Sequence, residues 1–158
     1  MNIAGIDPGT NGAIAVLDSE NPDSVELLDL KKNTIFEVFD WMEGEISSFS
    51  PGEIWIEDIH SMYGMSAKSN FGFGKNLGIV TAIAEVISAS RPNTVTPKIW
   101  QKYIGVTAKG KAIKKQVAKI AQGLYPTAEL HGKRGGLLDG RSDALMIAHY
   151  GLKHMEEQ

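Results

Sequence analysis

The alternation of apolar and polar residues predicts five short strands, three of them at the start of the chain. The first, NIAGID, alternates its large apolar residues and ends at Pro8-Gly9, a dipeptide that favours a turn. The run EIWIEDI, which follows Ser50-Pro51-Gly52, is apolar enough for a buried strand. We expect strands at residues 2–7, 13–17, 25–30, 53–59 and 93–95.

Apolar residues at three- and four-residue intervals predict the helices, and Thr96-Pro97 is a favoured helix start. We expect helices at 34–48, 74–89, 97–104, 111–124 and 139–154, an irregular segment at 60–76 and a loop at 129–138. This order predicts an α/β protein with a mixed five-stranded sheet flanked by helices. A three-strand antiparallel meander would be followed by two parallel strands. The 158 residues fit one domain over residues 1–158.

The composition excludes several kinds of chemistry. The chain has no cysteine, which excludes disulfides, thiolate nucleophiles and cysteine-bound zinc. No apolar run approaches the ~20 residues that span a bilayer, and the first residues, MNIAGIDPGT, lack the features of a signal peptide. We therefore expect a cytoplasmic protein, of a bacterium or a phage-infected cell, with no membrane partner.

The net charge of −3 is unevenly distributed along the chain. Residues 1–97 hold 5 Lys or Arg against 14 Asp or Glu, whereas residues 98–141 hold 10 against 2. A basic segment in an acidic chain is typical of a phosphate-binding surface beside a carboxylate cluster. A solvated, lysine-rich helix face has the same composition, so charge alone does not separate the two.

Four acidic residues stand where a hydrated side chain is costly unless it has a use. Asp7 ends the first strand, Glu57 lies near the end of the apolar fourth strand, and Asp139 and Asp143 lie four apart on one helix face. Clustered carboxylates repel one another unless a cation lies between them, and oxygen ligands suit Mg²⁺ or Mn²⁺. Taken singly, each residue also fits an ordinary role as a turn cap, an edge-strand residue, an N-cap or a first-turn charge.

Three segments resemble the catalytic motifs of a nuclease family. GIDPGTNGAIAVLD, WIEDIHSM and DGRSDALMIAHYG resemble the motifs of the RuvC-like Holliday junction resolvases, within the RNase H-like superfamily, and the likeness covers almost the whole chain. The chain looks most similar to the short, phage-type members. The resemblance implies an RNase H-like fold and a homodimeric endonuclease without an organic cofactor. Such an enzyme nicks a four-way DNA junction symmetrically and leaves 5'-phosphate and 3'-hydroxyl ends.

The resemblance also implies roles for the acidic residues. Asp7, Glu57 and Asp143 correspond to catalytic, metal-binding carboxylates of the family. The family's fourth ligand usually lies three residues before the last, where this chain has Gly140, so Asp139, one residue earlier, is the candidate substitute. These four residues would bind two Mg²⁺ or Mn²⁺ ions, which together assist phosphodiester hydrolysis.

The basic segment contains the residues expected to contact DNA phosphates. Resolvases of this family also use lysines near the scissile phosphate. Lys111 and Lys114 are the candidates, while Trp100 stands about where one such lysine is expected. The expected DNA contacts are Lys98, Lys102, Lys109, Lys111, Lys114, Lys115, Lys119, Lys133, Arg134 and Arg141.

The glycine-punctuated segment after the fourth strand contains candidates for a wedge that stacks on or unstacks bases at a junction. Met62 and Tyr63 are favoured. His60 stands where the family can carry a wedge aromatic; it could stack, bind phosphate, shuttle a proton or have no such role.

Two further sets of apolar residues have structural interpretations. Phe71 and Phe73 lie in the same glycine-punctuated segment and could also act as wedges, but we expect them to fold into the core. One face of the helix at 74–89 fits either a dimer contact or ordinary core packing. Its residues are Leu77, Val80, Ala84 and Ile87.

Three other functions remain compatible with parts of the sequence. GIDPGTNGAIAVLD also resembles the first phosphate-binding hairpin of sugar kinases and actin-like ATPases, but those proteins need two such domains. An RNase H-like nuclease acting on other branched DNA or on structured RNA would use the same carboxylates. A non-catalytic junction-binding module is disfavoured, because carboxylates near DNA weaken binding unless they hold metal.

Overall fold

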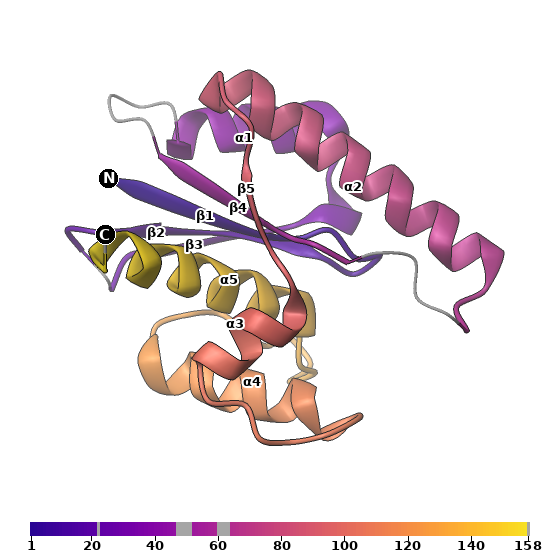
Figure 1. The fold of residues 1–158 in the computed structure, drawn as a ribbon, viewed down its shortest axis with the longest axis vertical. Coiled ribbons are helices and arrows are strands. Elements are labelled where there is room, and N and C mark those ends of the chain that lie inside the picture. The colour runs from indigo at the N-terminus through magenta and orange to yellow at the C-terminus, as the bar shows by residue number, and fades with distance from the viewer. Residues whose placement is uncertain (22, 47–51, 60–63, 158) are drawn as a thin grey trace.

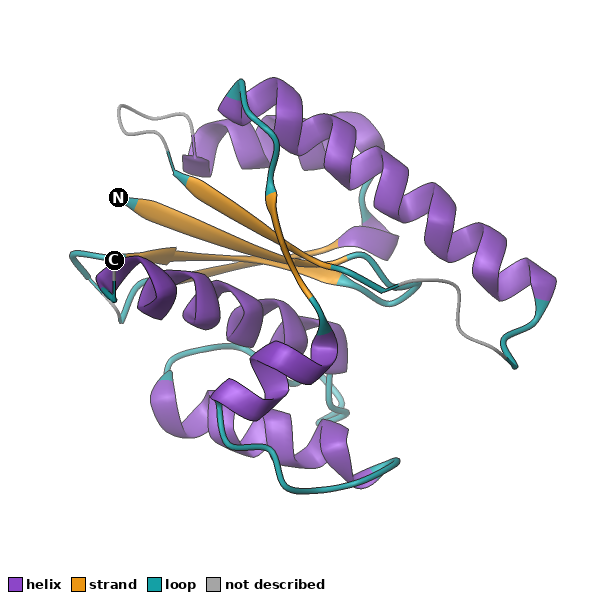
Figure 2. Cartoon of the chain, in the orientation of Figure 1, coloured by secondary structure: helices purple, strands orange, loops and turns teal. Residues whose placement is uncertain are grey.

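The computed structural model describes residues 1–21, 23–46, 52–59 and 64–157, and in it a five-stranded sheet separates two layers of helices (Figures 1 and 2). The strand order is β3-β2-β1-β4-β5. β1 pairs antiparallel with β2 and β2 with β3, whereas β4 and β5 run parallel to β1. The predicted mixed sheet is confirmed. The strands are β1 (Asn2–Asp7), β2 (Ala13–Asp18), β3 (Val25–Asp29), β4 (Glu53–Glu57) and β5 (Asn93–Val95).

The helices are η1 (Leu30–Lys32, a 3₁₀ turn), α1 (Ile35–Ile46), α2 (Ala67–Ser88), α3 (Pro97–Tyr103), α4 (Ala112–Leu124) and α5 (Asp139–Glu156). The predicted helices agree with the observed ones except at the start of α2, and the short turn η1, which takes Leu30 from the predicted third strand, was not predicted. The predicted irregular segment at 60–76 is wrong from Ala67 onwards. Ser66 caps α2 by accepting a hydrogen bond from the backbone N–H of Ser69. Extending a formed helix is far easier than nucleating one, so α2 tolerates the glycines in its first turns.

The two faces of the sheet are covered by different helices (Figure 1). One set of alternating strand residues, which includes Ile6 and Ile56, packs under α1 and α2. The other set, which includes Ile3 and Trp55, packs under α3, α4 and α5. Strand side chains alternate between faces, so each strand contributes to both cores.

The apolar face of α2 packs on its own chain. Val80 and Ala84 are buried in the core between α2 and the sheet. The partly buried Leu77 and Ile87 pack against this core. The expectation that Phe71 enters the core is wrong, because its side chain is 76% exposed. The first turns of α2 extend beyond the sheet, so the side chain of Phe71 has no core to pack against (Figure 1).

A close contact between α5 and β1 sets the position of the last helix. A Cβ at Gly5 would overlap the backbone of Ala144 and Ala148, so only glycine allows α5 to lie this near the strand. The small residues Ala144 and Ala148, both fully buried, complete the contact. The first turn of α5 is thereby held over the end of β1.

In the described ranges, every helix is too short or too polar to cross a membrane.

Candidate metal centre

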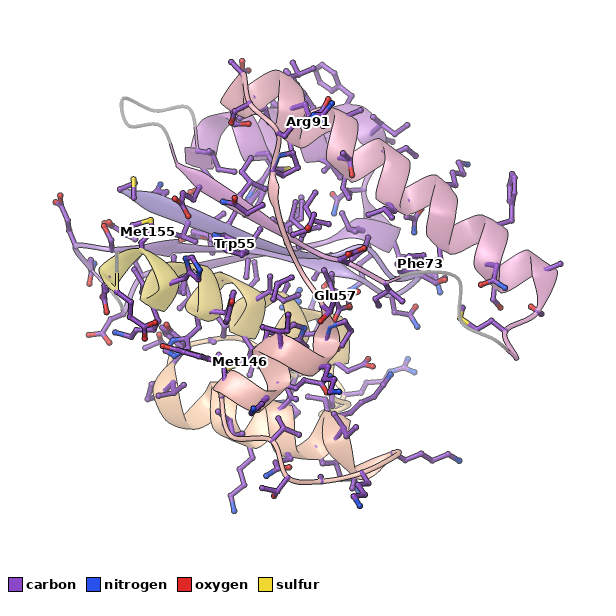
Figure 3. All side chains as sticks on the ribbon, viewed as in Figure 1. Trp55, Glu57, Phe73, Arg91, Met146 and Met155 are labelled. Atoms are coloured by element: carbon purple, nitrogen blue, oxygen red, sulfur yellow. The ribbon has the colours of Figure 1, made fainter. Side chains whose placement is uncertain are left out.

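Two of the four predicted carboxylates lie side by side at the end of the sheet. β1 and β4 are parallel, and Ile6 pairs with Ile56, so the residues that follow, Asp7 and Glu57, are neighbours. Both are the last residues of their strands. Their odd positions in the alternation put them on the face covered by α5, as for Ile3 and Trp55. Figure 3 shows Glu57 where β4 ends beside the start of α3.

The first turns of α5 add Asp143 to this pair. Burial, together with the charges of Asp7, Glu57 and Asp139, raises the pKa of Asp143 to about 8, although the nearby Lys114 opposes the shift. Side chains interact in this way only when they share one poorly solvated site. The structure thus brings together three residues separated by most of the chain.

The pKa values of the two strand carboxylates, Asp7 and Glu57, are raised as well. Burial raises the pKa of Glu57 to about 7, with a contribution from the charge of Asp7 and an opposing hydrogen bond from Trp100. Burial also raises the pKa of Asp7, against a 2.8 Å hydrogen bond that its Oδ1 accepts from the backbone N–H of Gly9. Three carboxylates that resist ionisation together form a site that a cation would stabilise.

Lys114 lies beside this cluster. Its ammonium group donates a hydrogen bond to Asp139 Oδ2 and forms an ion pair with it. That bond raises the pKa of Lys114, and the charges of Asp143 and Asp7 act in the same direction. Lys111, the other candidate, is exposed just before α4. Of the two, the geometry brings only Lys114 beside the carboxylates.

The position at which the family resemblance places a fourth ligand, Gly140, has no room for a side chain. A Cβ at Gly140 would overlap the backbone of Asn11 in the turn between β1 and β2, so no aspartate fits there. Asp139, with 28% of its side chain exposed, lies against Lys114 instead. The carboxylate therefore sits at the edge of the site, where the other three are more buried.

The sequence marked Trp100 only as standing where a lysine is expected, and its contact with Glu57 was not predicted. Trp100 is fully buried, and its Nε1 donates a 2.9 Å hydrogen bond to Glu57 Oε1. Nothing in the local pattern marks this contact, because Trp100 also occupies an ordinary apolar position of α3. Only the adjacency of β5 and β4, in which Val95 pairs with Glu57, brings the start of α3 to this carboxylate.

The donor set fits a hard divalent cation, although its side chains do not form a closed ligand group. Across the described ranges, no three Asp, Glu, His or Cys side chains are already arranged around one point. Asp7, Glu57 and Asp143 offer oxygen donors alone, and burial of each favours neutralisation by a cation. Oxygen ligands of this kind suit Mg²⁺ or Mn²⁺.

Most of the expected DNA-contact residues are exposed, although Lys114 also pairs with Asp139, and Arg141 is held within the protein. The guanidinium of Arg141 donates hydrogen bonds to the carboxylate of Asp29 at 2.7 and 3.0 Å and to the backbone carbonyl of Glu129 at 2.8 Å. Lys133 and Arg134 line a groove of about 510 Å³ beside the loop before α5. The exposed ones are Lys98, Lys102, Lys109, Lys111, Lys114, Lys115, Lys119, Lys133 and Arg134.

The proposed wedge residues His60, Met62 and Tyr63 lie outside the described residues. Phe73, on the second turn of α2, is partly exposed.

The chain is similar to solved structures. No protein-family model matches it, and neither does any curated protein. T. thermophilus RuvC in complex with a Holliday junction substrate superposes with a TM-score of 0.62 at 20% identity, over 98% of this chain and 93% of that one. A second Thermus thermophilus RuvC structure gives a TM-score of 0.57 at 19% identity, over 99% and 97%. The protein therefore has the RNase H-like fold of the RuvC structures, with Asp7, Glu57 and Asp143 gathered at the end of its central strands.

Proposed function

We propose that this protein is a divalent-metal-dependent endonuclease that cuts four-way DNA junctions. The observation that carries the proposal is the convergence of the buried Glu57 and the partly buried Asp7 and Asp143 in one site at the end of the sheet. Carboxylates that raise one another's pKa destabilise the fold, so their placement in one site indicates a functional role. The fold shared with RuvC in a junction complex supports the choice of substrate.

The four carboxylates would hold one or two Mg²⁺ or Mn²⁺ ions, Asp7, Glu57 and Asp143 as the inner ligands and Asp139 at the edge. When bound, such ions activate a water molecule and stabilise the leaving oxygen of a phosphodiester. Hydrolysis would form a bond between water oxygen and phosphorus and break the bond to the 3' oxygen, leaving 5'-phosphate and 3'-hydroxyl ends. Lys114, beside Asp139, would bring a positive charge next to the reacting phosphate.

The DNA would be held by the exposed lysines of α3 and α4 and by Lys133 and Arg134 in the loop before α5. These side chains have no role in the core, and their charge suits phosphates rather than bases. We further propose that the active protein is a homodimer, because two like sites related by symmetry would nick two strands of a symmetric junction.

Cleavage of labelled DNA tests this proposal. Four-way junction, linear duplex, splayed-arm DNA and structured RNA would be incubated with Mg²⁺, Mn²⁺ or EDTA. The proteins would be wild type, Asp7→Asn, and Asp40→Asn as a control that removes an exposed charge from α1. We expect paired nicks in the junction alone, lost in EDTA and in Asp7→Asn but not in Asp40→Asn.

Each other result has a defined meaning. Equal or faster cutting of splayed DNA or RNA would refute junction specificity while leaving a metal-dependent nuclease. Tight junction binding without cutting in either metal would refute the nuclease itself and favour a binding module.

A further inference from the structure

The hydrogen bond between Trp100 and Glu57 is an unusual use of a core residue. Trp100 is fully buried among the apolar residues under α3, α4 and α5. Its one polar atom, Nε1, donates to Glu57 Oε1 at 2.9 Å, across 43 residues of sequence. A packed indole cannot rotate away, so its N–H is a fixed donor, unlike the flexible ammonium of a lysine.

Glu57 combines a flexible side chain with a like charge beside it. A glutamate has three side-chain torsions, and Glu57 stands beside Asp7, whose charge repels it. Without a fixed donor, repulsion would turn the two carboxylates apart. The bond to Trp100 uses one lone pair of Oε1 and leaves Oε2 and the other lone pair for a cation.

We propose that Trp100 is a positioning residue, which holds the Glu57 carboxylate in the orientation that binds the metal. The inference rests on the metal centre proposed above. Ligating carboxylates are commonly held by hydrogen bonds from neighbouring residues, and removal of such a partner typically weakens metal binding 10–100-fold. Trp100 acts through Glu57 and would touch neither metal nor DNA.

The same strand provides a matched control. Trp55 is also buried, and its Nε1 donates a 3.0 Å hydrogen bond to Glu53, at the opposite end of β4 from the site. Figure 3 shows Trp55 and Glu57 at separate points along the sheet. Trp55→Phe and Trp100→Phe therefore remove the same kind of bond from one core, but only Trp100→Phe removes it from a proposed ligand.

Calorimetric titration with Mn²⁺ tests the inference without any catalytic readout. We expect Trp100→Phe to bind Mn²⁺ about 10–100-fold more weakly than wild type, whereas Trp55→Phe stays within about threefold. Junction affinity measured in EDTA should be the same for all three proteins. Equal Mn²⁺ affinity in Trp100→Phe and wild type overturns the role of Trp100. If wild type binds no Mn²⁺, the metal centre itself is refuted, and the role of Trp100 falls with it.

A measurement on the wild type covers the case in which Trp100→Phe does not fold. The indole N–H signals of ¹⁵N-labelled protein would be followed during a Mg²⁺ titration and assigned with Trp41→Phe and Trp55→Phe. We expect the Trp100 signal to move in step with saturation of the protein, and the other two to stay in place. A Trp100 signal that does not respond while backbone amides at the site do would overturn the inference.

Discussion

Replacing Glu57 by glutamine should stabilise the metal-free protein, in contrast to most substitutions of buried residues. Glutamine has nearly the same shape, and its side-chain oxygen can still accept the hydrogen bond of Trp100. It removes only the charge, which burial and Asp7 oppose. The size of this effect depends on pH, which makes it measurable.

The pKa of Glu57 is raised from 4.5 to about 7 in the folded protein. The folded state therefore binds more protons than the unfolded state between these values, so its stability falls as pH rises through that window. At 1.36 kcal/mol for each pH unit, the loss reaches about 3 kcal/mol above pH 7. Glutamine does not ionise, so Glu57→Gln should exceed wild type by up to about 3 kcal/mol at pH 8 and differ little at pH 4.5.

Urea unfolding in EDTA at pH 4.5, 6, 7 and 8 measures this difference. Glu85→Gln, an exposed glutamate on α2, is the matched control and should follow wild type at every pH. Mg²⁺ at about one hundred times its Kd would stabilise wild type by about 2.7 kcal/mol, which nearly removes the advantage of the variant at pH 8. A difference between Glu57→Gln and wild type that does not grow with pH would refute the reasoning, since it would mean that Glu57 is not a desolvated charge.

Three further predictions concern the helices around the site. Lys114→Met should slow junction cleavage at saturating Mg²⁺ by about 100-fold, because a charge beside the reacting phosphate stabilises the transition state. Lys111→Met should change the rate little. Single-turnover rates measure both variants, and equal rates for the two would contradict the assignment of Lys114. Gly5→Ala should lower the free energy of unfolding by about 1–3 kcal/mol through the clash with α5. Gly44→Ala, where a Cβ meets no atom within 4 Å, should leave it unchanged or raise it by up to about 1 kcal/mol in the same urea assay. Arg141→Gln should cost about 1.5–3 kcal/mol of stability through its lost bonds to a carboxylate. It should leave the salt dependence of junction binding unchanged, and a slope smaller by ~0.9 would instead identify Arg141 as a phosphate contact.

Part of the carboxylate cluster can be predicted from local sequence pattern. Asp7 and Glu57 each end an apolar strand, and both positions can be read from the sequence because strand period and turn residues are local properties. Parallel pairing of β1 with β4 then puts the two residues at one edge. The mixed sheet and most helix boundaries follow from the same kind of information.

The start of α2 and the exposure of Phe71 are the places where local pattern was misleading. Glycines in the first turns lower helix propensity, but the capped and packed remainder of α2 extends through them. Phe71 then lies on turns that extend past the sheet, so its apolar character does not bury it.

The partners of the site residues were decided by tertiary structure alone. Trp100 reaches Glu57 across 43 residues, and Arg141 reaches Asp29 across 112. Lys114 rather than Lys111 meets Asp139, because Lys114 lies in the first turn of α4, which packs beside α5, whereas Lys111 precedes the helix. The sequence by itself determined which residues could form strands, helices and a carboxylate site, since those depend on neighbours in the chain. Which donor holds each carboxylate depends on packing between distant segments, and that is present only in the folded protein.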